Sequence, residues 1–195
     1  GFNDVEGQRI RLGGRTYFGP NDPWRIQGYT AYGFKDQKIK YGINARVMLD
    51  KKNRFIASFG NRRDVEQIGA SLTTSTDVLG RSFASSSLVG TGTNDKLTSI
   101  NLTSAAIEIE PWRNLIMRLS ANYRTLESAS DTFSLDYIDS ASSTGISSEI
   151  QQFETSFSLA YFPKRKMTGF GVERYDANDD YARIFAQISI GDKDV

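Results

Sequence analysis

Acidic side chains are the residues of this sequence whose type and spacing could do chemistry. The chain contains no histidine and no cysteine, which removes the commonest general base, thiolate nucleophiles, disulfides and the commonest metal ligands. Glu108 and Glu110 share one side of an alternating stretch, and Glu154 lies on another such stretch. Paired carboxylates can hydrolyse glycosides or bind calcium. A carboxylate-based hydrolase therefore stays open, although neutralisation of these acids by inward arginines is the interpretation that we favour.

Three short motifs could indicate a binding function, but a structural role explains each of them better. "RLGGRT" (residues 11–16) has paired glycines but not the spacing of a phosphate-binding loop, so these glycines are expected to permit close strand approach. "NRRDVEQ" (61–67) could hold an anion or a lipid headgroup, but a self-paired strand end is favoured. "DANDD" (176–180) lacks the glycine and the final glutamate of a calcium-binding EF-hand loop. We predict no catalytic residue, cofactor or metal, and no enzymatic activity.

Composition points to a β-rich membrane protein. The 195 residues fit one domain, and 24 Lys and Arg against 23 Asp and Glu leave a net charge of +1, which gives no reason to expect nucleic acid as a partner. Hydrophobic residues make up 38% of the chain, and aromatic residues 12%. This combination is typical of membrane β-barrels, because half of every strand is polar. No apolar run is long enough for a transmembrane helix.

The elements that must position these side chains are β-strands. Apolar and polar residues alternate with a period of two, which predicts strands with one apolar face. Two long polar segments, 64–96 and 125–149, interrupt the pattern and are expected to be loops, with two to four weaker strands possible between the clear ones. The clear strands are expected at residues 5–18, 24–35, 41–49, 55–62, 97–110, 115–124, 153–162 and 181–190.

The two faces of these strands predict two environments. If the apolar face meets lipid, the polar face lines a lumen in which charges pair. If the apolar face lies in a protein core, the charges are the wet outside of a soluble barrel or sandwich. In the membrane interpretation, the lumen-facing charged residues are Arg9, Arg11, Arg15, Arg25, Arg46, Arg62, Glu108, Glu110, Arg118, Arg124, Glu154 and Arg183. The lipid-facing residues are Tyr41, Ile43, Val47, Leu49, Leu115, Leu119, Tyr123, Phe157, Ile184 and Ile188.

Strand ends and loop lengths favour the membrane interpretation. Aromatic residues such as Trp24, Tyr41 and Tyr123 lie near the ends of apolar faces, as in the aromatic girdles of membrane barrels. Links after Leu49 and Glu110 are tight, and those after residues 62 and 124 are long, which is typical of outer-membrane proteins. The link 163–180 breaks this rule unless it contains a small hairpin.

Three segments together resemble a known family. They are "FNDVEGQRIRLGGRT" (2–16), "GYTAYGFKDQKIKYG" (28–42) and "RRDVEQIG" (62–69), with a weaker echo in "NDKLT" (94–98). They are similar to Bacteroidetes-type outer-membrane proteins that join a carboxypeptidase-regulatory-like domain to a C-terminal β-barrel of unknown function. The resemblance implies a barrel in the outer membrane. The lock-loop signature of assembly-factor barrels, Val-Arg-Gly followed by an aromatic residue, is not found, so an assembly role is not implied.

The chain also departs from that family. It lacks the regulatory-like domain and finishes on "ISIGDKDV" rather than on an aromatic residue, so we expect a fragment or a reduced relative. We predict a single all-β domain over residues 1–195: an antiparallel up-and-down (meander) membrane β-barrel of about eight to twelve strands. Its partner would be the lipid bilayer of a Gram-negative outer membrane, and its role a structural anchor or a narrow pore. The alternative is a soluble β-barrel or β-sandwich ligand-binding module, periplasmic or extracellular.

Overall fold

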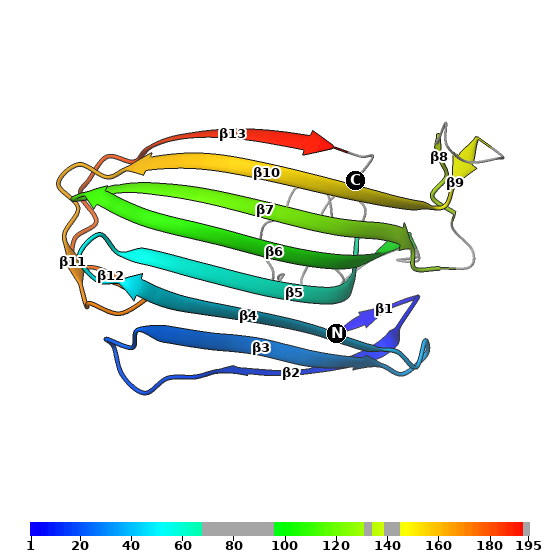
Figure 1. Ribbon diagram of the computed structural model, residues 1–195. Coiled ribbons are helices and arrows are strands. Elements are labelled where there is room, and N and C mark those ends of the chain that lie inside the picture. The colour runs from blue at the N-terminus through cyan, green and yellow to red at the C-terminus, as the bar shows by residue number, and fades with distance from the viewer. Residues whose placement is uncertain (68–95, 131–133, 139–144, 193–195) are drawn as a thin grey trace.

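A nine-stranded antiparallel sheet makes up most of the fold (Figure 1). The computed structural model describes residues 1–67, 96–130, 134–138 and 145–192. Neighbours in the sheet follow one another along the chain, which is a meander, and the prediction of an all-β antiparallel fold is confirmed. No helix in these described ranges is long and apolar enough to cross a membrane. The strands are β1 (Phe2–Asn3), β2 (Gly7–Arg15), β3 (Trp24–Gly33), β4 (Ile39–Asp50), β5 (Phe55–Gln67), β6 (Leu97–Trp112), β7 (Leu115–Ser128), β10 (Glu149–Tyr161) and β13 (Ile184–Asp192).

In the middle of the sheet, the strands are longer than the stretches of alternating apolar and polar residues that predict them. β5 continues into the segment that was expected to be a loop, because its pairing with β6 runs on to Gln67 opposite Leu97. β7 likewise continues to Ser128, opposite Thr98. Backbone pairing does not require apolar side chains, so a pattern based on hydrophobicity does not predict these polar strand ends. The rest of the first expected loop, residues 68–95, lies outside the described residues, as do parts of the second.

The described sheet is open, so the expected closed barrel is not confirmed. Within the described residues, β2 forms one border of the sheet with β1 beside it, β13 forms the other, and the two do not pair (Figure 1). β1 occupies part of the outer edge of β2, with Phe2 opposite Gln8 and Asn3 opposite Gly7. β1 therefore covers only the first residues of β2, and the rest of the outer edge of β2 has no strand beside it among the described residues.

The sheet curls, and the direction of its curvature defines an inner and an outer face. Arg9 on β2 and Asp64 on β5 are in contact, with Nη2 and Oδ2 2.9 Å apart, although β3 and β4 lie between these strands. Side chains three strands apart can meet in this way only on the concave side of a curved sheet. The face that carries Arg9 and Asp64 is thus the inner face, and the opposite one is the outer face.

The connection between β10 and β13, residues 162–183, crosses one end of the sheet. It contains the small hairpin of β11 (Met167–Thr168) and β12 (Tyr175–Asp176), beside the ends of β4 to β6 in Figure 1. Val172 packs against Met48 and Ile56 in a small buried cluster. Its backbone N–H donates to the carbonyl oxygen of Asp22 at 2.9 Å. The connection is an end cap that ties the last strands to the turn between β2 and β3. The other small hairpin pairs β8 (Tyr137–Ile138) with β9 (Ile146–Ser147).

Truncating Val172 should loosen this end cap. Val172 is 2% exposed, so Val172→Ala removes buried apolar contacts and should lower the free energy of unfolding by about 2 kcal/mol. Denaturant unfolding in detergent micelles, followed by tryptophan fluorescence, measures the change. Phe170 lies in the same cap and is 82% exposed, so Phe170→Ala is the control and should change stability by less than about 0.5 kcal/mol. Equal effects of both substitutions would contradict this packing.

Candidate functional site

Two adjacent rows of residues show how sharply the faces of the sheet differ. Both rows run across the same seven strands, from β3 to β13, and they are one residue apart on each strand. The outer row is apolar throughout, whereas the inner row consists of arginines and small, mostly hydroxylated residues. The outer row is Trp24, Val47, Ala57, Ile107, Leu119, Phe157 and Ile188, and the inner row is Arg25, Arg46, Ser58, Ala106, Ser120, Ser156 and Ser189.

The outer face exposes its large apolar side chains. Ile43 is 48% exposed, Leu119 44% and Ile188 62%. These fractions belong to a continuous band over seven strands, whereas soluble monomers keep exposed apolar patches small. All the residues that the sequence predicts to face lipid lie on this face: Tyr41, Val47, Leu49, Tyr123 and Ile184 are exposed as well, and Leu115 and Phe157 are half-buried.

The apolar band has a limited height along the strands. On β7 it extends from Leu115 to Tyr123, which matches the roughly nine to eleven residues with which a tilted strand crosses a hydrocarbon core. Beyond Tyr123, the outer face turns polar, with a row formed by Arg63, Asn101, Thr125 and Gln151. Trp112, paired with Leu115, borders the band at the opposite end. Aromatic residues therefore lie at both borders of the band.

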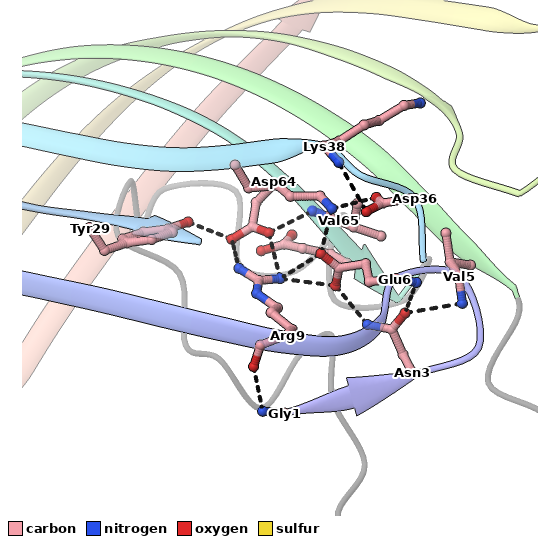
Figure 2. Close-up of polar contacts among 12 residues, drawn as sticks. Gly1, Asn3, Val5, Glu6, Arg9, Tyr29, Asp36, Lys38, Asp64 and Val65 are labelled. Carbon is pink, nitrogen blue, oxygen red and sulfur yellow. Dashed lines mark hydrogen bonds and ion pairs between the residues drawn. The ribbon is translucent and has the colours of Figure 1, made fainter. Parts of the chain in front are cut away.

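The inner face holds a buried ionic cluster near the start of β2 (Figure 2). Arg9 binds Asp64 through two contacts, Nη1 to Oδ1 at 2.8 Å and Nη2 to Oδ2 at 2.9 Å. Arg9 also lies 3.2 Å from Glu6, and the Lys40 ammonium lies 2.7 Å from the second oxygen of Glu6. The Tyr29 hydroxyl donates to Asp64 at 2.5 Å. Asn3, Glu6, Arg9, Tyr29, Asp36, Lys40 and Asp64 form this inner ionic cluster.

A tight turn between β1 and β2 places Glu6 in the cluster. The side-chain oxygen of Asn3 accepts hydrogen bonds from the backbone N–H groups of Val5, at 3.1 Å, and Glu6, at 2.7 Å. The Asn3 amide nitrogen in turn donates to the Glu6 carboxylate at 2.7 Å. Glu6 is completely buried, and Lys40 also pairs with Asp36. Because a buried charge without partners is strongly unfavourable, these contacts are what allow Glu6 to remain inside.

Two glycines provide the space that the cluster needs. A Cβ atom on Gly42 would lie 2.5 Å from the ring of Tyr29, and one on Gly33 would collide with Asp36 and Glu6. The ring of Tyr29 therefore lies over Gly42, and the guanidinium carbon of Arg11 lies 3.4 Å from its centroid. This cation–π contact holds Tyr29 on the inner face. Gly13 of "RLGGRT" also permits close approach, since its Cβ would lie 2.9 Å from the carbonyl oxygen of Gly28.

The three segments that carry the family resemblance meet at this cluster. Glu6 and Arg9 come from residues 2–16, Tyr29 and Lys40 from 28–42, and Asp64 from 62–69. Of these five residues, only Arg9 was named as lumen-facing from the sequence. The others were missed, although each lies inside a quoted segment. The signal that could have found them was the presence of charged or hydroxyl side chains at positions facing the same side as Arg9.

The remaining predicted charges pair in separate groups on the inner face. Glu108 lies 3.9 Å from Arg46 and 3.6 Å from Arg118, and Glu154 lies 3.8 Å from Arg124. Glu110 pairs instead with Arg54, at 3.5 Å, and with Arg174. The three glutamates that a hydrolase would need are thus not brought together. Of the other arginines, Arg62 pairs with Glu66, and Arg15 and Arg25 both pair with Glu173.

Arg183 differs from its expected position within a strand. β13 begins at Ile184, and the preceding residues belong to the end cap. Tyr181 donates a hydrogen bond to Asp176 at 2.6 Å and receives one from Arg183 at 3.3 Å, so these side chains bond to one another within the end cap. Hydrogen bonds from Arg165 and Tyr181 lower the pKa of Asp176. No cluster of three or more acidic side chains in the described part of the chain is arranged to hold a metal ion.

Comparison with known proteins found no match, so a functional assignment must rest on the geometry of the sheet and its two faces. No family model matches the chain, and neither a curated protein nor a solved structure matches it. The class that the geometry defines is an antiparallel β-meander with an exposed apolar outer face and an ion-paired inner face.

Removing Arg9 should strongly destabilise the fold. Arg9→Ala leaves the buried Asp64 carboxylate without the cation that binds it and leaves Glu6 with Lys40 alone, so the free energy of unfolding should fall by about 3–5 kcal/mol. Arg63 is adjacent to Asp64 along β5 but is exposed, so Arg63→Ala is a matched control, with an expected change below about 0.5 kcal/mol. Denaturant titration of refolded protein measures both. Similar stabilities of the two variants would show that the cluster does not hold the sheet.

Adding one methyl group at Gly42 should displace Tyr29. Gly42→Ala forces the ring out of its position, which should cost about 1–3 kcal/mol. In the background of Tyr29→Ala, the same substitution should cost much less, because the colliding ring is gone. The four unfolding free energies of this double-mutant cycle test the contact. Additive effects would refute it.

Proposed function

We propose that this chain forms the wall of a non-enzymatic β-barrel in the outer membrane of a Gram-negative bacterium, where it is a structural anchor or a narrow pore. The observation that carries the proposal is the pair of adjacent rows, one apolar and exposed on the outer face, the other polar on the inner face. A soluble β-barrel or β-sandwich has the opposite arrangement, with its apolar side chains inside. The height of the apolar band and its aromatic borders also support a bilayer as the partner.

The inner face supports an anchor or a narrow pore rather than a wide channel. On β2 to β5, the inner ionic cluster fills the concave side with paired charges. On β6 to β13, short side chains such as Ser120, Ser156 and Ser189 share the inner face with ion pairs between Arg118 and Glu108 and between Arg124 and Glu154. A buried apolar cluster of Ile100, Leu102 and Leu126 fills the same face further along these strands. The end cap lies across one end of this interior. Passage, where it occurs, is thus limited to small polar molecules.

A bilayer location requires both borders of the sheet to be paired. Unpaired backbone N–H and carbonyl groups are strongly unfavourable in hydrocarbon, so an open edge does not persist there. β2 and β13 run in opposite directions, because all successive neighbours between them are antiparallel. In the proposed barrel, these two edges pair antiparallel with one another or with further strands of the same kind, which would make the meander an up-and-down barrel.

The two tryptophans test the orientation of the outer face. Trp24 and Trp112 both lie on this face at the same end of the sheet. In zwitterionic bilayers, lipids brominated near the headgroup should quench their fluorescence more than lipids brominated near the chain ends, because these residues border the apolar band. Trp24→Phe and Trp112→Phe, measured separately, show whether each tryptophan meets lipid.

Solubility distinguishes the two classes of protein. The proposed barrel should require detergent and migrate differently on gels before and after heating. A protein that is monodisperse in plain buffer, with tryptophans that brominated lipids do not quench, would establish the soluble binding module instead. Activity on a glycoside that Glu108→Gln abolishes would restore the hydrolase class.

A further inference from the structure

A cationic pocket lies at the end of the sheet that carries the short turns. Its volume is about 640 Å³, and three connections contribute to it: the β4–β5 turn, the β6–β7 turn and the end cap. Five cationic side chains line it, against a single carboxylate. The lining residues are Lys51, Lys52, Arg54, Glu110, Pro111, Arg113, Met167, Gly169, Phe170 and Arg174.

The single carboxylate does not neutralise the pocket. Glu110 is shared by Arg54, at 3.5 Å, and Arg174, so one negative charge faces two guanidinium groups. Burial lowers the pKa of Arg54, and the positive charge of Arg174 lowers it further. Arg174 Nε is buried and has no hydrogen-bond partner among the described residues. The pocket therefore keeps an excess of positive charge and an unused donor, which suits an anionic ligand with several acceptor oxygens.

Apolar side chains form the border of the same pocket. Met167 and Phe170 line it from the end cap, and Phe170 is exposed. Trp112 follows Pro111 directly, is 71% exposed and borders the apolar band of the outer face. The cations thus lie where the apolar band ends. This arrangement suits a molecule that has a charged headgroup and hydrocarbon chains.

We infer that this pocket binds the phosphate group of an anionic membrane lipid. The inference rests on the proposed function, because the pocket meets lipid only where the outer face lies in a bilayer. Arg54 and Arg174, held by Glu110, provide fixed donors for the phosphate oxygens, and the exposed Lys51, Lys52 and Arg113 add attraction at the rim. The lipid chains then lie along the outer face beside Trp112.

Trp112 can report binding directly. In the full chain with Trp24→Phe, kept in zwitterionic micelles, brominated phosphatidylglycerol should quench Trp112 at a concentration at least about tenfold lower than brominated phosphatidylcholine. Lys52→Gln with Arg113→Gln should remove most or all of this preference, because each cation removed lowers it by about fivefold. Lys38→Gln with Arg63→Gln removes the same charge from exposed residues at the opposite end of the sheet and should leave the preference within about twofold of its original value.

The outcomes separate this inference from the proposed function. Equal quenching by the two brominated lipids overturns the lipid site but leaves the membrane barrel standing, whereas no quenching by either lipid overturns the barrel. Equal loss of preference in both double variants assigns the effect to net charge and also overturns the site. Inorganic phosphate is the competitor. Displacement of phosphatidylglycerol at a phosphate concentration similar to that of the lipid would identify a site for free phosphate and overturn the lipid assignment.

Discussion

The contact between Arg9 and Asp64 is the interaction on which the shape of this sheet depends. It joins two strands that have two others between them, and it exists only while the sheet is curved toward the face that carries both residues. A flat sheet would leave Asp64 apart from Arg9, and the Asp64 carboxylate would need water. The curvature of the sheet, the burial of these charges on the inner face and the exposure of apolar side chains on the outer face therefore depend on one another.

The two halves of the inner face use different means to remain polar without being wide. In the first half, long charged side chains reach across strands and bind one another, and glycines leave room for them. In the second half, ion pairs such as Arg118 with Glu108 lie beside pairs of short side chains such as Ser156 with Ser189, whose hydroxyl oxygens are 2.8 Å apart. The end cap then adds apolar packing at one end, through Val172. All three features support the proposed anchor with a narrow interior.

Much of the fold follows from the sequence, because a strand's side chains alternate strictly. The period-two pattern from Leu115 to Tyr123 predicts both a strand and its outer residues, and the same reasoning holds for the other long strands. The inner ionic cluster did not follow, since contacts between Asp64 and residues such as Arg9 depend on curvature that no local pattern encodes. The position of Arg183 outside β13 was missed for a related reason, because Tyr181 hydrogen-bonds to Asp176 and Arg183 in a segment that has no period-two signal. Hydrophobic alternation specifies faces but not which distant side chains meet.

The glycines beneath the cluster have a consequence for how such a chain can diverge. Outer-face residues such as Val47 or Ile107 can exchange freely among aliphatic side chains, because lipid or any apolar surroundings accept them all. Gly33 and Gly42 have no such freedom, since even one methyl group collides with Glu6, Asp36 or Tyr29. Descendants that keep the cluster should retain both glycines long after their strands have ceased to be recognisably alike.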